Sequence, residues 1–276
     1  MLWNSSKING YAIAASDGNI GTVIDFLFDD TSWLVRWLVV DTGNWLSGRK
    51  VLLPSSALAH LDRETAECSI KLTMQQIKDS PLIDTERPVS RQMESAVYGY
   101  YDYNPYWDSG YGYTGGLGYT GGFGYLGGMG GAMPMSQGSR RREEEIAEAQ
   151  RARDDVHLRS VKAVTGYHIH ASDGEIGHVD DFLIQDTDWS IHYIVVDTRN
   201  WWPGKKVLIS TRSVKAIDWG GQLVNIDVDR QKVKDGPAYD ATRTVDQAYD
   251  QGHREYYGVS WVSPGNEPPT KRRSAA

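Results

Sequence analysis

Four histidines gather in the second half of the chain, at a spacing that could bind a metal ion or relay protons. They are His168, His170, His178 and His192. The first two lie two positions apart in a β-rich run, so a strand would turn both imidazoles toward one outward face. Imidazole is a common metal ligand and titrates near neutral pH. Solvated surface histidines are the alternative interpretation of this pattern.

Five carboxylates form a second group of candidates, near the end of the same expected strand in each half. They are Asp25, Asp29, Asp30, Asp181 and Asp186. Clustered carboxylates can hold a divalent cation or carry acid–base chemistry. They do not follow the Asp-x-Asp-x-Asp-Gly order of a calcium loop, and aspartate is a favoured turn residue. Turn formation is therefore the preferred interpretation.

Apolar residues in two loops could anchor a protein partner. The candidate partner-binding residues are Trp45, Leu46, Trp201 and Trp202. The tryptophan recurs in both halves although loops usually vary, and an exposed aromatic loop is a natural anchor. The alternative is that each tryptophan folds back to close the end of a barrel.

The sequence offers little for catalysis. Cys68 corresponds to Val224 in the other half, which indicates a core position rather than a nucleophile. The glycine runs after Gly115 and Gly121 lack the strand and helix that flank a phosphate-binding loop. We therefore expect no enzymatic activity, no cofactor and no metal as the first interpretation.

The candidates recur because the chain contains a duplication. Residues 11–21 return as residues 167–177, and Val39–Trp45 returns as Val195–Trp201. Both matches share one offset of about 156 residues, and roughly 25 of 43 positions from Tyr11 to Leu53 are identical. The chain is therefore expected to carry two copies of one small domain.

Each copy is predicted to be a small barrel of five or six short strands. The strands expected in the first copy are residues 8–15, 20–28, 35–40, 50–53 and 68–72. Asp17-Gly18 suits a tight hairpin turn, and Gly21 suggests a bulge or a close backbone approach. A short helix is expected over Thr73–Ser80, with Thr73 as its N-cap. The predicted fold class is mainly β: two antiparallel barrels, each with a short C-terminal helical extension.

The sequence motifs resemble those of the PRC-barrel domain. They are Gly21-x-Val23-x-Asp25-Phe26-Leu27, the run Trp33 to Thr42, Val51-Leu52-Leu53-Pro54, and their counterparts in the second copy. The resemblance implies a module that works mostly by contact. Such domains occur in the H chain of purple-bacterial photosynthetic reaction centres, where they influence electron and proton delivery, and in a ribosome-maturation factor. This chain departs from both in having two barrels.

Composition limits the partners. The net charge is −7 and neither copy is basic, which argues against binding to duplex nucleic acid. No signal peptide and no apolar run of roughly 18 residues is found, so we expect a soluble, cytoplasmic protein. The basic tail around Lys271 would allow only weak peripheral contact with an anionic membrane.

The expected organisation has five parts. They are a first PRC-barrel domain (1–95), a disordered Gly/Tyr-rich linker (96–139), a charged helical segment (140–156), a second PRC-barrel domain (157–250) and a disordered tail (251–276). We interpret the chain as a non-catalytic adaptor that binds a protein of unknown identity, with its two barrels either tethered or packed on each other. The alternative function is a metal- or proton-handling module that uses the second-copy histidines.

Overall fold

The computed structural model describes residues 1–46, 48–81, 97–103, 157–198, 205–242, 245 and 247–258. Met1–Thr85 and His157–Ala276 belong to one compact unit, and Glu86–Val156 belong to another. The first unit contains both copies of the repeat, each built around its own β-sheet. The fold class is therefore mainly β, as predicted.

The first copy forms a sheet in the order β5-β4-β3-β2-β7-β6. Its strands are β2 (Ala12–Ala15), β3 (Gly18–Asp29), β4 (Val35–Asp41), β5 (Lys50–Pro54), β6 (Leu58–Asp62) and β7 (Glu67–Ile70). Its helices are α1 (Ser5–Ile8), the 3₁₀ turn η1 (Ser55–Ala57) and α2 (Met74–Lys78). The pairing of β2 with β7 is parallel, whereas the other pairs of this path are antiparallel.

The second copy repeats this arrangement in the order β13-β14-β9-β10-β11-β12-β15. Its strands are β9 (His168–Ala171), β10 (Gly174–Gln185), β11 (Ile191–Asp197), β12 (Lys206–Ser210), β13 (Val214–Asp218), β14 (Leu223–Ile226) and β15 (Ala238–Tyr239). Its helices are α5 (Val161–Val164), the 3₁₀ turn η3 (Thr211–Ser213), α6 (Arg230–Asp235) and α7 (Gln247–Tyr257).

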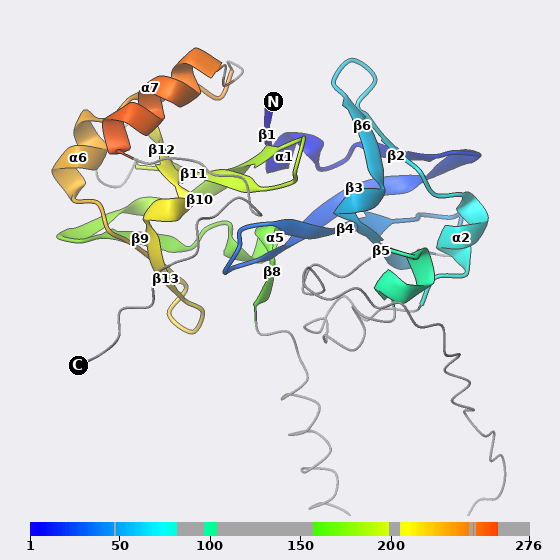
Figure 1. Ribbon diagram of the computed structural model, residues 1–276. Coiled ribbons are helices and arrows are strands. Elements are labelled where there is room, and N and C mark those ends of the chain that lie inside the picture. Colours follow the sequence, from blue (N-terminus) through cyan, green and yellow to red (C-terminus); the bar gives the residue numbers. More distant parts are fainter. Residues whose placement is uncertain are drawn as a thin grey trace, which may run out of the picture. The chain divides into compact units, whose positions relative to one another are not determined.

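Each copy gives its first strand to the sheet of the other copy (Figure 1). Strand β1 (Leu2–Asn4) pairs antiparallel with β10, and β8 (Leu158–Ser160) pairs antiparallel with β3. The registers are equivalent, because Leu2 lies opposite Gln185 and Leu158 lies opposite Asp29. The two copies are thus joined by a reciprocal strand exchange with pseudo-twofold symmetry.

The short helix α2 confirms the N-cap that the sequence predicted. Thr73 caps α2, with its side chain accepting from the Gln76 amide while the Gln76 side chain accepts from the Thr73 amide. This capping box satisfies two amides that the helix itself leaves unpaired. In the second copy Asp229 caps α6 by accepting from the Lys232 amide at 2.7 Å.

The C-terminal helices differ from the expected organisation. Residues 97–101, placed in the linker by the sequence, are helical, and α7 runs to Tyr257, beyond the expected boundary at residue 250. The first residues of the expected tail therefore belong to α7, where the side chain of His253 is 1% exposed. The rest of the linker, the charged segment 140–156 and the end of the tail lie outside the described residues.

Within the described ranges, no helix is both long enough and apolar enough to span a membrane.

Gly21 and Gly177 mark close backbone approaches, as predicted. Gly21 has φ +146°, and a Cβ atom there would lie 2.0 Å from the carbonyl oxygen of Asp41. Gly177 has φ +142°, and a Cβ atom there would lie 2.1 Å from the carbonyl oxygen of Asp197. A register shift accompanies Gly177 between Glu175 and Gly177. Only glycine lets β3 and β10 bend against the strand that follows.

We predict that Gly21→Ala lowers the free energy of unfolding by about 2–4 kcal/mol, because the added methyl overlaps a carbonyl and the backbone is strained. Gly10→Ala is the matched control. Gly10 has φ +88° but no atom within 4 Å of its Cβ position, so its cost should be about 1 kcal/mol. Urea denaturation followed by circular dichroism measures both, and equal losses would contradict the close-approach explanation.

Candidate functional site

Three of the four candidate histidines share one hairpin of the second copy. His168 is exposed and His170 is half-buried, while Ile169 between them is fully buried. His178 on β10 lies directly opposite His168 on β9. The expected outward face is therefore present. On this face, His168 Nδ1 lies 2.9 Å from Glu175 Oε1.

His192 lies apart from the other three. On β11 the residue opposite His178 is Asp197, at the other end of the strand from His192. Burial lowers the pKa of His192 to about 4, and Asp188 acts in the opposite sense. Within the described ranges, no three His, Cys, Asp or Glu side chains gather to hold a metal ion. Of the four candidates, His168 is therefore exposed, while His170, His178 and His192 are half-buried.

The acidic candidates lie at the junction between the two copies. Asp181 of β10 accepts hydrogen bonds from the start of the other copy: from Asn4 Nδ2 at 2.9 Å, from Ser5 Oγ at 2.6 Å, and from the amide and hydroxyl of Ser6 at 3.1 and 2.5 Å. The Asp181 side chain is buried. A buried carboxylate is stable when its oxygens are satisfied in this way. Asp181 thereby fastens β1 and the beginning of α1.

Asp25 performs the equivalent task in the first copy. It accepts from Ser160 Oγ at 2.5 Å and from the Lys162 amide at 3.1 Å. Ser160 in turn caps α5 by accepting from the Ala163 amide. Burial raises the pKa of Asp25, although these hydrogen bonds act in the opposite sense. Asp25 and Asp181 therefore hold equivalent segments across the pseudo-twofold axis.

A second pair of aspartates holds the outer ends of the exchanged strands. Asp30 contacts His157 Nδ1 at 2.8 Å and Arg159 Nε at 3.2 Å. Asp186 accepts from the Met1 amino group at 2.5 Å and from Trp3 Nε1 at 3.1 Å. Three of the five acidic candidates also fit the favoured interpretation as turn residues: Asp30 and Asp186 lie in turns, and Asp29 accepts from the amides of Thr31 and Ser32.

Each copy contains a cation–π pair at equivalent positions, but the arginine and the tryptophan have exchanged places. In one copy the guanidinium of Arg63 lies 4.3 Å from the ring centroid of Trp3. In the other, the guanidinium of Arg159 lies 3.9 Å from the ring of Trp219. Position 159 is equivalent to position 3, and 219 to 63, by the repeat offset. Each pair holds an exchanged strand against a hairpin of the copy from which that strand comes. The cation–π contact is therefore kept, although arginine and tryptophan have exchanged positions.

Two tryptophans join the copies through their backbone. Trp33 and Trp189 both have φ +59°, a left-handed conformation that costs free energy in a bulky residue. This conformation lets each carbonyl accept from the other copy: Ile191 donates to Trp33 at 2.7 Å, and Val35 donates to Trp189 at 2.9 Å. Both side chains are buried. The sequence did not signal the strain.

The copies differ in the groups that they place beside this junction. In the first copy Arg36 forms an ion pair with Asp29, and both side chains are buried. His192 and Gln185 occupy the equivalent positions in the second copy. The first copy therefore uses a buried charge pair where the second uses groups that are neutral near pH 7.

The loop that carries Trp45 is held closed at its base. Thr42 Oγ1 donates to the Arg49 carbonyl at 2.6 Å, and the guanidinium of Arg49 donates to carbonyls at the end of α2, including that of Lys78 at 2.9 Å. Trp45 and Leu46 are half-buried. In the second copy Thr198 Oγ1 donates to the Lys205 carbonyl at 2.6 Å, and Lys205 Nζ donates to the Lys234 carbonyl at 2.7 Å. Both loops thus have the same closure, while Trp201 and Trp202 lie outside the described residues.

Cys68 behaves as the sequence indicated. Its side chain is fully buried, and burial raises the pKa of the thiol to about 12. The thiolate form is therefore suppressed at neutral pH.

The exchanged strands are the functional element that sequence reasoning missed. Leu2–Asn4 and Leu158–Ser160 share only their first residue, and three-residue strands carry no usable periodicity. Extending the repeat alignment toward the N-terminus would have paired these two segments, because the same offset aligns Gly10 with Gly166.

Comparison with known proteins identifies the fold. Residues 4–66 match the family described as the PRC-barrel domain. The chain therefore carries a PRC-barrel domain over these residues, and a second, similar β-sheet domain occupies residues around 158–257. No curated protein matches the chain.

We predict that Asp181→Ala lowers the free energy of unfolding by about 2–4 kcal/mol, because it leaves the side-chain donors of the buried residues Asn4 and Ser5 without their acceptor. Amide hydrogen exchange should also show loss of protection at Leu2–Asn4. Asp62→Ala is the control, since Asp62 is half-exposed and accepts from Glu64 and Thr65 within its own turn; it should cost less than about 1 kcal/mol. Unchanged protection of β1 in Asp181→Ala would refute the anchoring role.

The exchanged cation–π pair can be tested by copying one arrangement onto the other. Trp3→Arg alone removes a ring that is 5% exposed and should cost about 2–3 kcal/mol. Adding Arg63→Trp recreates the order found at Arg159 and Trp219, and should recover about 0.5–1 kcal/mol beyond the sum of the single effects. Thermal and urea denaturation of the four proteins of the cycle provide the measurement. Strict additivity would show that the two residues do not interact.

Proposed function

We propose that the chain is a non-catalytic protein-interaction module whose two PRC-barrel domains act as one preassembled pair. The observation that carries this proposal is the reciprocal exchange of β1 and β8, which makes each domain a part of the other's sheet. Two tethered domains lose conformational freedom when both bind one partner, whereas a preassembled pair has already lost that freedom on folding. Preorganisation of this kind raises affinity without adding contacts.

The loops after β4 and β11 are the proposed contact surface. Both are closed at the base by a threonine and a basic residue that reaches the end of the neighbouring helix, so the two ends of each loop are fixed before binding. The aromatic residues proposed as anchors are Trp45 and Trp201, with Leu46 and Trp202 beside them. A protein with two equivalent sites, or a dimer, would suit two such loops.

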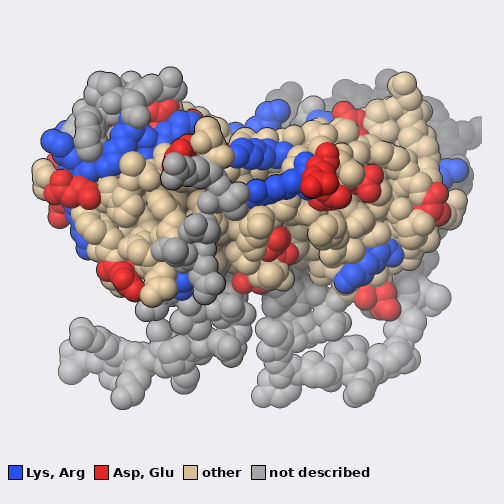
Figure 2. Space-filling model, turned by 90° about the horizontal axis from the view of Figure 1, so that it is seen from above, with Lys and Arg blue, Asp and Glu red and all other residues tan. Residues whose placement is uncertain are grey.

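The charge distribution also suits a protein partner rather than a polyanion. On the face shown in Figure 2, groups of Lys and Arg alternate with groups of Asp and Glu between uncharged areas. Together with the net charge of −7, this mixture favours specific contact over nonspecific attraction to nucleic acid. We place the interaction in the cytoplasm, in keeping with the resemblance to reaction-centre H chains.

The test is a crosslinked capture from the native cell with the full chain and with the double variant Trp45→Ala/Trp201→Ala. Loss of two anchors should reduce capture of the partner about tenfold or more, as for residues at the centre of an interface. The captured protein is then purified and its Kd measured for both chains. Tyr256→Ala is the control, because it also removes an exposed aromatic side chain (37% exposed), but one that lies on α7 and not in either loop. Equal affinity of both chains, with the variant folded by circular dichroism, would reject the loops as the contact surface.

A further inference from the structure

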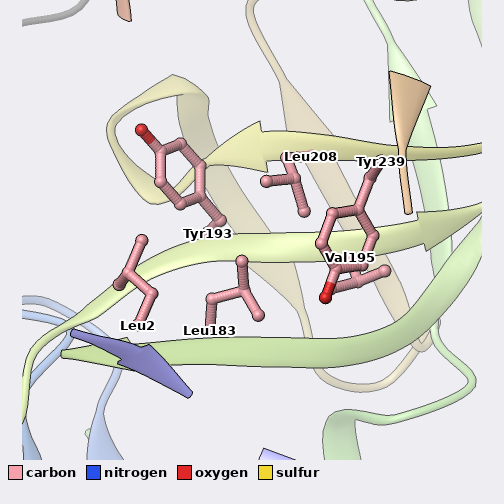
Figure 3. Packing of buried hydrophobic residues seen from close by; sticks show 6 residues of the cluster. All are labelled: Leu2, Leu183, Tyr193, Val195, Leu208 and Tyr239. Carbon is pink, nitrogen blue, oxygen red and sulfur yellow. The ribbon is translucent and has the colours of Figure 1, made fainter. Parts of the chain in front are cut away.

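Helix α7 covers an apolar surface of the second domain. Six buried residues form this cluster: Leu2, Leu183, Tyr193, Val195, Leu208 and Tyr239 (Figure 3). Ala241, Val245 and Tyr249 pack against it from the segment that leads into α7 and from α7 itself. The cluster includes Leu2 from the exchanged strand, so the helix and the exchange share one core.

His253 lies at the centre of the contact between α7 and the sheet. Its side chain is 1% exposed, and Nε2 lies 2.9 Å from the carbonyl oxygen of Leu208. Because a carbonyl only accepts, Nε2 must carry the proton of the neutral ring. Within the described part of the chain, Nδ1 has no hydrogen-bond partner. A second proton at Nδ1 would therefore create a buried charge without a partner at that atom.

The surroundings of His253 are mostly aromatic. Its ring centroid lies 4.8 Å from that of Tyr193 on β11, and 4.6 and 6.3 Å from those of Tyr257 and Tyr249 on α7. From the sheet, Tyr193 donates to Asp250 Oδ1 at 2.6 Å. These contacts bury the imidazole in a medium that solvates a charge poorly.

The charged groups around this contact come from three elements. On α7 itself, Asp250 forms an ion pair with Arg254 at 2.8 Å. On β11, His192 precedes Tyr193 and is itself buried with a lowered pKa. From α6, Lys232 Nζ lies 5.9 Å from the ring of Tyr257. Burial lowers the pKa of His253, while the Leu208 carbonyl and Asp250 act in the opposite sense.

The first copy lacks this titratable group. Val97 is the residue equivalent to His253, and Trp37 is equivalent to Tyr193. Val97 is 1% exposed. The histidine is therefore particular to the second copy.

We propose that His253 makes the docking of α7 acid-sensitive, so that protonation of its buried ring releases the helix and uncovers the apolar surface around Tyr193 and Leu208. The protein would then present this surface only in an acidic environment, in addition to the loops assigned above. The surface that release uncovers is apolar, and in the closed form it is covered by α7 and by the segment that leads into it.

The direction of the pH effect follows from the lowered pKa. The docked state favours the neutral imidazole, so its stability is complete above the ordinary histidine pKa and declines as the pH falls below that value. Between the ordinary pKa and the lower pKa of the docked state, each pH unit should increase the opening of α7 by up to about tenfold.

The experiment compares amide-exchange protection factors of Gln247–Tyr257 in the full chain at pH 7.5 and 5.5. Protection factors correct for the intrinsic effect of pH on exchange. In the unmodified chain, protection of α7 should fall by up to about tenfold, while that of β10 should stay constant. His253→Val copies the residue of the first copy and should keep α7 protected at both pH values. His168→Ala removes an exposed histidine and should behave as the unmodified chain.

Two results would overturn the proposal. One is unchanged protection of α7 in the unmodified chain across this pH range. The other is the same loss of protection in His253→Val, which would assign the effect to another group such as His192. If His253→Val does not fold, NMR titration of the His253 ring in the unmodified chain decides the question: its protonation must coincide with the loss of α7 protection.

Discussion

Two carboxylates, the half-buried Asp25 and the buried Asp181, hold the structure together by accepting hydrogen bonds from the beginning of the opposite domain. An exchanged strand of three residues forms too few ladder bonds to stay in place alone. The aspartates add charge-assisted bonds to the residues that follow each strand, and these bonds also satisfy the first amides of a short helix. Without them β1 and β8 would be free ends rather than parts of a sheet.

This constraint explains why the duplicated copies have diverged unevenly. Groups that face the junction keep their role, even where the residues are exchanged, as in the Arg63–Trp3 and Arg159–Trp219 pairs. Groups away from it are free to change, so histidines accumulate on β9 and β10 of the second copy only. The strained conformation shared by Trp33 and Trp189 persists because each carbonyl serves the other domain.

The same coupling links the proposed functions. Leu2 of the exchanged strand packs in the cluster that α7 covers, and Asn4 Oδ1 accepts from Tyr239 of that cluster at 3.1 Å. Release of α7 would therefore loosen the packing around β1, whereas the loops closed by Thr42 and Thr198 have their own anchors. The loops and the surface beneath α7 are thus separate parts of the pair of domains.

The sequence by itself determined the duplication, the mainly β fold, the glycine positions of close approach and the cap of α2, because each of these depends on neighbouring residues or on a repeated pattern. Only the tertiary structure decided what Asp25, Asp30, Asp181 and Asp186 do, since their partners lie more than a hundred residues away. Spacing could suggest a metal site or a turn, but not an exchange of strands. For the same reason the burial of His253 could not be predicted: it depends on a sheet that α7 meets only after folding.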